Sequence, residues 1–451
     1  MQLKDIHTIY FVGIGGIGMS ALARYFNGRD VLVHGYDRTS TPLTQQLERE
    51  GMTIHYHEAI DLIPGGVNLV VYTPAVPADH QELQYFRKNG FLIKKRAEVL
   101  GIISRGMKTV AIAGTHGKTT TSSITAHLLR HGGLDCTAFL GGIAQNYGSN
   151  FIEGQGEWIV VEADEFDRSF LQLSPNLAGI LSMDADHLDI YGNEKSLLET
   201  GFGAFVNLLE PGGKVWVQAD FAQYFSGNPA VESFGADKGT FQAKNIRVED
   251  GFFVFDYESP THQIVGLKFT MPGKHNVENA TLAINVALEL GVAEIKIREG
   301  LANFKGIQRR FESVYRDDAI AYYDDYAHHP TELNAAINAA RTLFPGNKIT
   351  GIFQPHLYSR TRDFADGFAQ ALDLLDEILL LDIYPARELP IEGVSSDMLV
   401  EKMKNKNVKQ LSLAEVMKEL ENRSLEVLLT LGAGDISTLV PVIKKYLQDT
   451  A

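Results

Sequence analysis

A segment that ends in a lysine and two threonines carries the strongest chemical signal in the chain. The residues from 109 to 120 have the pattern of a strand, a loop with two glycines and the start of a helix. In such a loop, successive backbone amides surround phosphate oxygens, and Lys118 neutralises charge at the β- and γ-phosphates. The Thr119 hydroxyl is placed for Mg²⁺, a cation that prefers oxygen ligands. The segment predicts a nucleoside triphosphate site, although Ile112 stands where the strict P-loop pattern has a glycine. The candidate ATP contacts in this loop are Gly114, Thr115, His116, Gly117, Lys118, Thr119 and Thr120.

A second glycine-rich loop lies near the N-terminus, after one predicted strand and before a predicted helix. Gly13 permits a tight turn, Gly15 lets the backbone approach a pyrophosphate, and Gly18 lets the helix pack closely. An acid ends the next strand about 20 residues further on, where it can contact a ribose or a base edge. The loop predicts diphosphate binding, but NAD, FAD and a UDP-sugar all carry a diphosphate. The candidate contacts are Gly13, Gly15, Gly16, Gly18 and Asp37, together with Thr73, Pro74 and Ala75 after the third predicted strand.

The elements that must position these loops alternate between strand and helix almost throughout, which is typical of α/β domains with mostly parallel sheets. Three times a new series begins, with predicted strands at 9–12, 109–113 and 320–324. A strand-rich stretch from Phe241 to Met271 predicts a small antiparallel excursion in the middle series. Further strands are predicted at 31–36, 69–72, 158–161, 178–181, 214–218, 349–353, 377–381 and 427–431, and a helix at 276–290. We expect three domains, at 1–104, 105–308 and 309–451.

Composition limits the setting in which these loops work. At 451 residues the chain is too long for a single core, and its net charge of −15 argues against nucleic acid as a main partner. No run of about 18 apolar residues predicts a membrane helix, and the N-terminus lacks a signal peptide pattern. The single cysteine, Cys136, fits a reducing compartment and is expected as a small buried side chain. We therefore expect a cytoplasmic protein.

Five motifs in a fixed order resemble those of the Mur ligases of peptidoglycan synthesis. The resemblance covers the whole chain and implies an N-terminal Rossmann-like domain that binds a UDP-sugar. It also implies a central P-loop-type ATPase and a C-terminal Rossmann-like domain that binds an amino acid. The motifs are Gly114–Thr121, Val161–Glu165, Asp186–Asp189, Gly273–Asn279 and Asp324–Pro330.

The resemblance also implies a reaction, the ATP-dependent joining of L-alanine to UDP-N-acetylmuramate. The substrate carboxylate attacks the γ-phosphate of ATP to form an acyl phosphate, and the amine of L-alanine then displaces phosphate. The expected cofactors are ATP and Mg²⁺. The expected assembly is a monomer or homodimer without nucleic acid or membrane partners.

Further site residues are implied by the same resemblance. Glu162, at the carboxyl end of a predicted strand, and His187 are the implied Mg²⁺ ligands beside the Thr119 hydroxyl. Asn276 and Asn279 lie three residues apart on one helix face, where their amides can pair with an adenine edge. Asp325 is the implied ribose-binding acid. Arg310 is placed to reach phosphate or acyl-phosphate oxygens, with a salt bridge as the alternative role.

The choice of amino acid is expected in the C-terminal domain. His328, His356 and Arg360 are the candidates for contacting L-alanine, with Arg360 pairing its carboxylate as a planar fork. One departure concerns this loop, because many family members have Arg directly after its His and this chain has Leu357. Either that contact is dispensable or the amino-acid site is built differently here.

Four other functions fit part of the sequence. A murein peptide ligase would add L-Ala-γ-D-Glu-meso-diaminopimelate to the same UDP-sugar. A folylpolyglutamate synthase type would share the ATP chemistry but lacks the leading Rossmann-like domain that Gly13–Gly18 indicates. An NAD-dependent oxidoreductase would use the first loop and have no need of Lys118, Glu162 and His187. A non-catalytic nucleotide-binding protein would bind ATP without releasing ADP.

Overall fold

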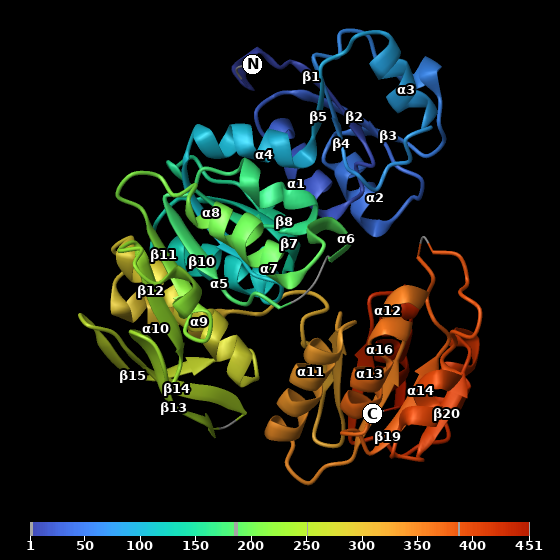
Figure 1. Cartoon of the computed structure of the whole chain (residues 1–451). Helices are drawn as coiled ribbons and strands as arrows, with labels where there is room; N and C mark the ends of the chain where they lie inside the picture. Colours follow the sequence, from blue (N-terminus) through green and yellow to red (C-terminus); the bar gives the residue numbers. More distant parts are fainter. Residues whose placement is uncertain (1–2, 185–187, 250, 387, 451) are drawn as a thin grey trace. The chain divides into compact units, whose positions relative to one another are not determined.

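The computed structural model describes residues 3–184, 188–249, 251–386 and 388–450, and the chain folds into two compact units (Figure 1). The five-stranded sheet and most of the ten-stranded sheet belong to unit 1, and the six-stranded sheet belongs to unit 2. Unit 1 comprises Met1–Lys244, Asp256–Leu267 and Glu278–Phe304. Unit 2 comprises Asn245–Phe255, Lys268–Val277 and Lys305–Ala451.

The first sheet of unit 1 has five strands in the order β3-β2-β1-β4-β5, all parallel. The order reverses between β1 and β4, so the chain leaves these two strands in opposite directions and opens a crevice at their carboxyl ends. Both the first glycine loop and the segment from Thr73 to Ala75 begin at this edge. The strands are β1 Thr8–Val12, β2 Leu32–Tyr36, β3 Thr53–His55, β4 Leu69–Tyr72 and β5 Ile93–Lys95. The helices are α1 Ile17–Asn27, α2 Pro42–Arg49, α3 Gln81–Lys88 and α4 Arg96–Arg105.

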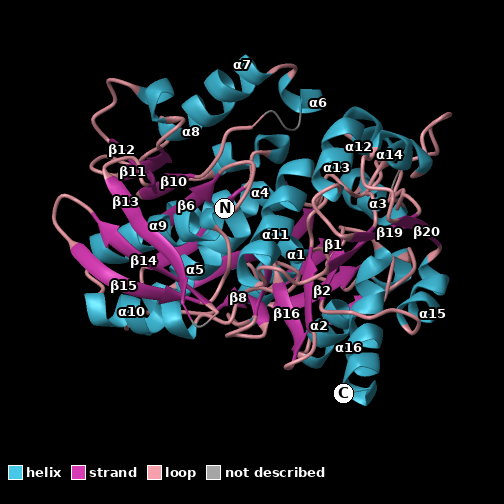
Figure 2. Cartoon of the chain, turned by 90° about the horizontal axis from the view of Figure 1, so that it is seen from below, coloured by secondary structure: helices cyan, strands magenta, loops and turns pink. Residues whose placement is uncertain are grey.

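The second sheet has ten strands in the order β15-β14-β13-β12-β11-β10-β6-β9-β7-β8. Strands β6, β7 and β9 to β13 pair in parallel, while β8 is antiparallel to β7. Helices lie on both sides of this sheet, α7 and α8 on one and α10 on the other (Figure 2). The strands are β6 Lys108–Ala113, β7 Thr137–Ala144, β8 Ser149–Ile152, β9 Trp158–Ala163, β10 Leu177–Ile180, β11 Lys214–Gln218, β12 Val231–Ala236, β13 Phe241–Glu249, β14 Phe252–Glu258 and β15 Gln263–Phe269. The helices are α5 Lys118–His131, α6 Leu188–Tyr191, α7 Glu194–Ser196, α8 Ala204–Val206, α9 Lys274–Glu289 and α10 Glu294–Asn303.

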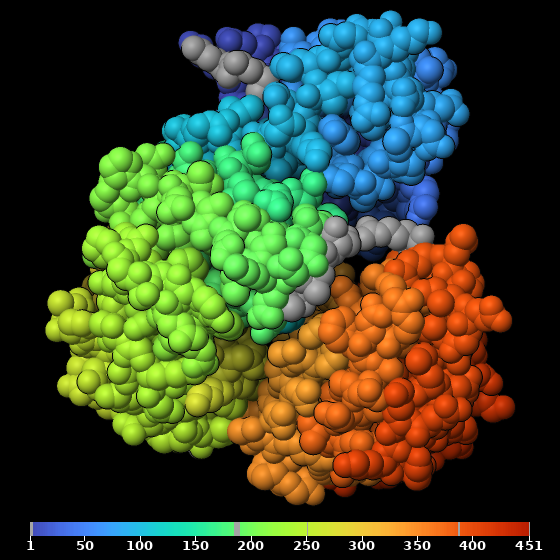
Figure 3. All heavy atoms as spheres, in the orientation of Figure 1, coloured from blue at the N-terminus to red at the C-terminus, as the bar shows by residue number. Residues whose placement is uncertain are grey.

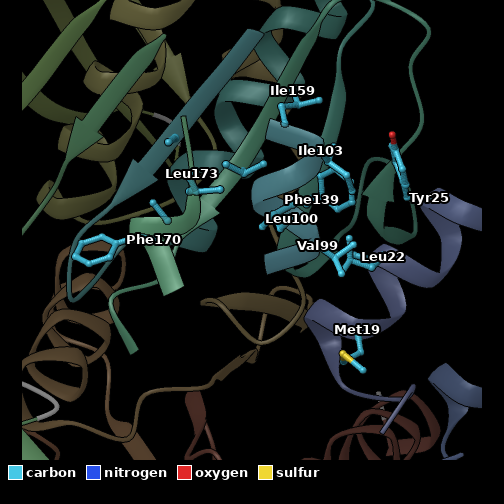
Figure 4. Packing of buried hydrophobic residues seen from close by; sticks show 14 of the residues in the cluster. Met19, Leu22, Tyr25, Val99, Leu100, Ile103, Phe139, Ile159, Phe170 and Leu173 are labelled. Carbon is cyan, nitrogen blue, oxygen red and sulfur yellow. The ribbon is translucent and has the colours of Figure 1, made fainter. Parts of the chain in front are cut away.

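Helices α1 and α4 join the two sheets of unit 1, because both pack on elements of the second sheet (Figure 4). One continuous core includes Leu22 and Tyr25 of α1, Ile103 of α4, and Phe139 and Ile159 of β7 and β9. The rings of Tyr25 and Phe139 lie 5.5 Å apart between centroids. Each large apolar side chain buried in this way contributes roughly 1.5–3 kcal/mol to stability. The shared core places both glycine loops in one compact unit, whose surface is continuous from blue to green in Figure 3.

Unit 2 contains a six-stranded sheet in the order β16-β17-β21-β18-β19-β20. All of its pairings are parallel except that of β16 with β17. Apolar side chains on both faces of the sheet form two separate clusters under the helices. The strands are β16 Glu312–Arg316, β17 Ala321–Asp325, β18 Ile349–Phe353, β19 Glu377–Leu381, β20 Val408–Leu411 and β21 Val427–Leu431. The helices are α11 Pro330–Leu343, α12 Tyr358–Asp363, α13 Ala365–Leu372, α14 Asp397–Lys402, α15 Val416–Leu420 and α16 Leu439–Thr450.

The predicted fold class, three α/β domains with mostly parallel sheets, is confirmed by these three sheets. Each strand and helix expected from the sequence is present within two residues at either end. Cys136 is fully buried, and burial raises the pKa of its thiol to about 12, so it is the inert side chain that was expected. None of the helices in the described parts of the chain combines the length and apolar character that a membrane crossing requires.

Candidate functional site

The second glycine loop connects the carboxyl end of β6 to the first turn of α5. Gly114 has φ +135° and Gly117 has φ +83°, a region that residues with a Cβ rarely adopt. A side chain at position 114 would place its Cβ 2.9 Å from the Ser182 backbone nitrogen. A side chain at position 117 would place its Cβ 2.7 Å from Oδ1 of Asn279. Both glycines are therefore required by conformation and by space.

Lys118 is turned back onto its own loop. Its Nζ donates to the Gly114 carbonyl oxygen at 2.6 Å and to Oε2 of Glu165 at 2.7 Å. Burial alone would lower the pKa of the ammonium group, but the carboxylates of Glu165, Asp164 and Glu162 hold that pKa above its ordinary value. Lys118 therefore stays charged and faces the concave side of the loop. Glu165 was not among the predicted site residues.

Glu162 is the last residue but one of β9 and lies beside the first turn of α5. Oε2 of Glu162 accepts from the Thr119 hydroxyl at 3.2 Å, and Oε1 accepts from the Ser122 hydroxyl at 3.3 Å and from the Gly141 backbone N–H. A carboxylate and a hydroxyl at this distance are the hard oxygen donors that suit Mg²⁺. His187, the third predicted ligand, lies outside the described residues. Among the residues that are described, no group of three or more His, Cys, Asp and Glu side chains is arranged to hold a metal.

Ser182, just after β10, organises the remainder of this loop. The hydroxyls of Thr115 and Ser182 are 2.9 Å apart, and the His116 backbone N–H donates to the Ser182 hydroxyl at 2.9 Å. The His116 ring lies 3.5 Å from Oδ2 of Asp184. Thr120 is buried in the first turn of α5. His116 and Ser182 thus fix the loop backbone, and Ser182 was not predicted.

Asn276 and Asn279 of α9 are both buried, and Asn279 lies next to this loop. Nδ2 of Asn276 donates to the Pro272 carbonyl oxygen at 2.7 Å, so part of its amide anchors the start of the helix. Asn279 reaches Gly117, as the close approach of its Oδ1 shows. The pair shares a helix face as predicted, and its contact with a base stays a proposal.

The first glycine loop has the expected turn, with Gly13 at φ +86°. The Gly15 backbone N–H donates to Oδ2 of Asp37 at 2.8 Å, which ties the loop to the end of β2. The role expected for Gly18 was close packing of helix on strand. Instead its hydrogen atoms face Arg96, and a Cβ at position 18 would lie 2.7 Å from Nη1 of that side chain. Thr73 caps the neighbouring turn, since its hydroxyl accepts from the Ala75 backbone N–H at 3.4 Å.

A cavity of about 390 Å³ within unit 1 extends from the first glycine loop to Glu162. Its wall carries predicted UDP-sugar contacts and the predicted metal ligand Glu162, which come from both sheets. A molecule held by its diphosphate at the first loop can therefore extend to the carboxylate beside Lys118 and Thr119. The residues that line it are Gly16, Ile17, Gly18, Met19, Ala21, Leu22, Thr73, Ala75, Arg96, Leu100, Phe139, Leu140, Gly141, Glu162, Asp164 and Phe166.

In unit 2 the segment before β16 and the end of β17 come together. The carboxylate of Asp325 accepts from the Phe311 and Ala327 backbone N–H groups, both at 2.7 Å. Burial raises the pKa of Asp325 to about 7, and the nearby charge of Arg310 opposes that rise. Arg310 lies 3.9 Å from Glu332 and packs over the Tyr326 ring at 5.4 Å. The candidates Arg310 and Asp325 are thus neighbours in unit 2.

The three amino-acid candidates gather in the same unit. The rings of His328 and His356 lie 5.9 Å apart between centroids. Burial lowers the pKa of His328, and the charge of Arg360 lowers it further, while Glu332 at 3.3 Å opposes both effects. His328 is therefore mostly neutral near pH 7 and can accept a hydrogen bond. Leu357, the departure noted above, has φ +70° and precedes α12.

Three family models match the chain in succession. The Mur ligase family catalytic domain matches residues 8–108 and the Mur ligase middle domain matches residues 112–287. The model described as Mur ligase, glutamate ligase domain, matches residues 309–439. Together they cover most of the chain in the order of its three sheets.

Curated relatives match over their full length. The UDP-N-acetylmuramate–L-alanine ligase of Flavobacterium psychrophilum is 50% identical, with 100% of each chain covered. The ligase of that name from Porphyromonas gingivalis W83 is 46% identical, with 98% of this chain and 99% of that one covered. Among solved structures, the UDP-N-acetylmuramate–alanine ligase of Thermotoga maritima is 30% identical with a TM-score of 0.86, covering 98% and 100%. A murein peptide ligase from Psychrobacter arcticus is 22% identical with a TM-score of 0.71, covering 98% of each chain, a likeness of fold.

Proposed function

The chain belongs to the Mur ligase family, and on that premise we propose that it joins L-alanine to UDP-N-acetylmuramate with ATP. The products are UDP-N-acetylmuramoyl-L-alanine, ADP and phosphate, and the setting is peptidoglycan biosynthesis in the cytoplasm. The observation that carries this proposal is the cavity of unit 1. It leads from a diphosphate-type loop to Glu162, next to the loop of Lys118.

The first step is phosphoryl transfer to the carboxylate of the UDP-sugar. The first glycine loop holds the diphosphate, so the lactyl carboxylate lies toward the Glu162 end of the cavity. Lys118 and the amides of its loop hold the β- and γ-phosphates of ATP in line with that carboxylate. A carboxylate oxygen forms the new bond to the γ-phosphorus as the bond to the ADP oxygen breaks. Positioning and charge neutralisation supply most of the catalysis in reactions of this kind.

Glu162 and Thr119 are the described residues that would hold Mg²⁺. The cation supplies charge neutralisation between the carboxylate and the γ-phosphate, two anions that otherwise repel each other. Ser122 and Gly141 orient the Glu162 carboxylate through its other oxygen. Asn276 and Asn279 are our candidates for adenine, and Asp325 for ribose.

The second step is attack of the L-alanine amine on the acyl phosphate. The acyl carbon forms a bond to nitrogen and releases phosphate, while the amine loses one proton. We assign the amino acid to His328, His356 and Arg360, with the planar guanidinium pairing the carboxylate of L-alanine. Burial keeps His328 mostly neutral, and we assign it the role of accepting the proton. Arg310 is our candidate for contacting the acyl-phosphate oxygens.

We also propose domain boundaries at 104 and 308, close to the gaps between the three matched regions. A monomer or a homodimer would satisfy this account equally, because every candidate residue belongs to one chain.

The experiment that tests the proposal measures ADP release with ATP, Mg²⁺ and UDP-N-acetylmuramate. Three reactions are compared, with no amine, with L-alanine, and with the tripeptide L-Ala-γ-D-Glu-meso-diaminopimelate. We expect strong stimulation by L-alanine alone. Stimulation by the tripeptide alone would contradict the assignment and make the chain a peptide ligase with the same fold. ADP release that no amine stimulates would reject both ligase functions.

A further inference from the structure

We infer that Arg96 binds an oxyanion of the UDP-sugar inside the cavity of unit 1 and sets the affinity for that substrate. The inference rests on the proposed function and adds a residue to it. Arg96 is the first residue of α4 and comes directly after β5, so it begins at the same sheet edge as the first glycine loop. None of the motifs used in the sequence analysis contains it.

The side chain of Arg96 packs against Gly18 of α1, in space that a Cβ would occupy. At Gly18 a Cβ would lie 2.7 Å from Nη1, 3.0 Å from Cδ and 3.2 Å from Cζ of Arg96. Glycine at this position therefore leaves a passage through which the guanidinium reaches the cavity. Gly18 therefore makes room for the Arg96 side chain, a role beyond the helix packing expected of a glycine at this position.

The negative charges on the cavity wall and on the substrate favour a cation at the position of Arg96. Of the residues that line the cavity, Glu162 and Asp164 carry negative charge and Arg96 alone carries positive charge. The substrate brings a diphosphate and a carboxylate, so it meets two fixed carboxylates with a single side-chain cation to offset them. A guanidinium presents five N–H donors in a planar fork that matches a carboxylate or a phosphate.

The guanidinium is held loosely in the structure. Nη2 of Arg96 is 3.5 Å from Oδ2 of Asp164, the outer limit of a hydrogen bond, and Asp164 is half exposed. Asp164 thus orients the fork toward the cavity and leaves most of its donors for a ligand. An oxyanion between Gly18 and Asp164 would meet the fork from the cavity side.

The neighbouring residue Lys95 provides a matched control. Its Nζ pairs with Asp167 at 2.7 Å, so it also ties the start of α4 to the segment after β9. Lys95 does not line the cavity, whereas Arg96 does. A purely structural role for Arg96, as a link between these two elements, would be shared by Lys95.

The test compares Arg96→Met, Arg96→Lys and Lys95→Met in the full chain. Binding of UDP-N-acetylmuramate is measured by calorimetry without ATP, and KM values for the UDP-sugar and ATP are measured in turnover. We expect Arg96→Met to weaken UDP-sugar binding by about 10- to 100-fold, the range for hydrogen bonds to a charged group, with little change in KM for ATP. Arg96→Lys should recover part of the loss, and Lys95→Met should stay within about twofold of wild type. Gly18→Ala should weaken binding like Arg96→Met, because it displaces the same side chain.

One further ligand identifies the oxyanion that Arg96 binds. UDP-N-acetylglucosamine has the diphosphate and lacks the lactyl carboxylate. If Arg96→Met weakens both UDP-sugars equally, Arg96 binds the diphosphate, and if it weakens only UDP-N-acetylmuramate, Arg96 binds the carboxylate. Unchanged binding in Arg96→Met, or equal losses in Arg96→Met and Lys95→Met, would overturn the inference. Failure of the wild-type chain to bind UDP-N-acetylmuramate would instead reject the proposed function.

Discussion

The glycine loops of unit 1 and the loop segments of unit 2 both contain residues with positive φ, but the types of residue at those positions differ. In unit 1 the residues at positive φ in these loops are Gly13, Gly114 and Gly117, which adopt that region at no steric cost. In unit 2 the corresponding residues are Arg309 and Phe311, on either side of Arg310, and Leu357, directly after His356. A residue with a Cβ in that region costs about 1–2 kcal/mol.

The difference follows from what each region presents to its ligand. Phosphates are held by backbone amides, so a side chain is an obstacle and glycine is the best residue. The candidates of unit 2 act through side chains, and their backbone is held by neighbours such as Asp325, which accepts the Phe311 N–H. A site that binds its ligand through backbone amides can therefore be recognised in the sequence by its glycines. A site that binds through side chains depends on the surrounding fold to hold its backbone.

The largest expected effect is that of Lys118→Met in unit 1. Removing the cation at the β- and γ-phosphates should reduce kcat for ADP formation by about 10²-fold or more. Binding of UDP-N-acetylmuramate should stay near wild type, because the first glycine loop belongs to the other sheet. A stopped assay of ADP release measures the effect on kcat, and calorimetry measures the binding of UDP-N-acetylmuramate. Loss of both together would show that the two sites are not separable in the way described.

Gly117→Ala tests whether the backbone of that loop needs glycine. The added Cβ would lie 2.7 Å from Oδ1 of Asn279 on a backbone with φ +83°, so we expect a rise of about 10-fold or more in KM for ATP. Gly133→Ala is the matched control, because that glycine also has positive φ and a Cβ there meets no atom within 4 Å. Similar effects of both substitutions on ATP kinetics would mean that strain alone, away from the site, explains the loss.

The surroundings of Lys118 and Gly117 also show how much of the site could be predicted from the sequence alone. The glycine loops and Asp37 were predictable because strand, loop and helix recur at fixed spacing, whereas the role expected of Glu162 came from the family resemblance. Glu165 was not predictable, since a second acid in the same motif gives no sign of which one pairs with Lys118. Nor was strand β7, because its two central glycines weaken the strand pattern. Gly141 of that strand leaves room for the Glu162 carboxylate, a contact that only the folded sheet reveals.

A pH dependence should distinguish the candidate ribose acid of unit 2 from the loops of unit 1. Burial raises the pKa of Asp325 to about 7, so it is mostly protonated at pH 6 and mostly ionised at pH 8. Because an ionised carboxylate is the stronger acceptor, KM for ATP should be about fivefold higher at pH 6 than at pH 8. Asp325→Asn should flatten that profile. A profile that is unchanged in Asp325→Asn would remove Asp325 from the ATP site.

The smallest expected effect concerns the strained backbone beside His356. Leu357→Gly relieves a φ of +70° at the expense of chain entropy, so we expect a net gain in unfolding free energy of up to about 1 kcal/mol. Denaturant unfolding, followed by a probe within unit 2, measures that gain. KM for L-alanine should rise at the same time if the strain positions His356. A destabilised variant would show that the Leu357 side chain contributes more through contacts than its backbone loses through strain.

The central claim is that the carboxylate of the UDP-sugar attacks the γ-phosphate within unit 1. The most direct test uses UDP-N-acetylmuramate with ¹⁸O in its lactyl carboxylate, followed by mass analysis of the phosphate released with L-alanine. We expect one ¹⁸O atom to be transferred to phosphate in each turnover, because the bridging oxygen of the acyl phosphate leaves with phosphorus. Phosphate without ¹⁸O would contradict an acyl phosphate and the role assigned to the cavity between the first glycine loop and Glu162.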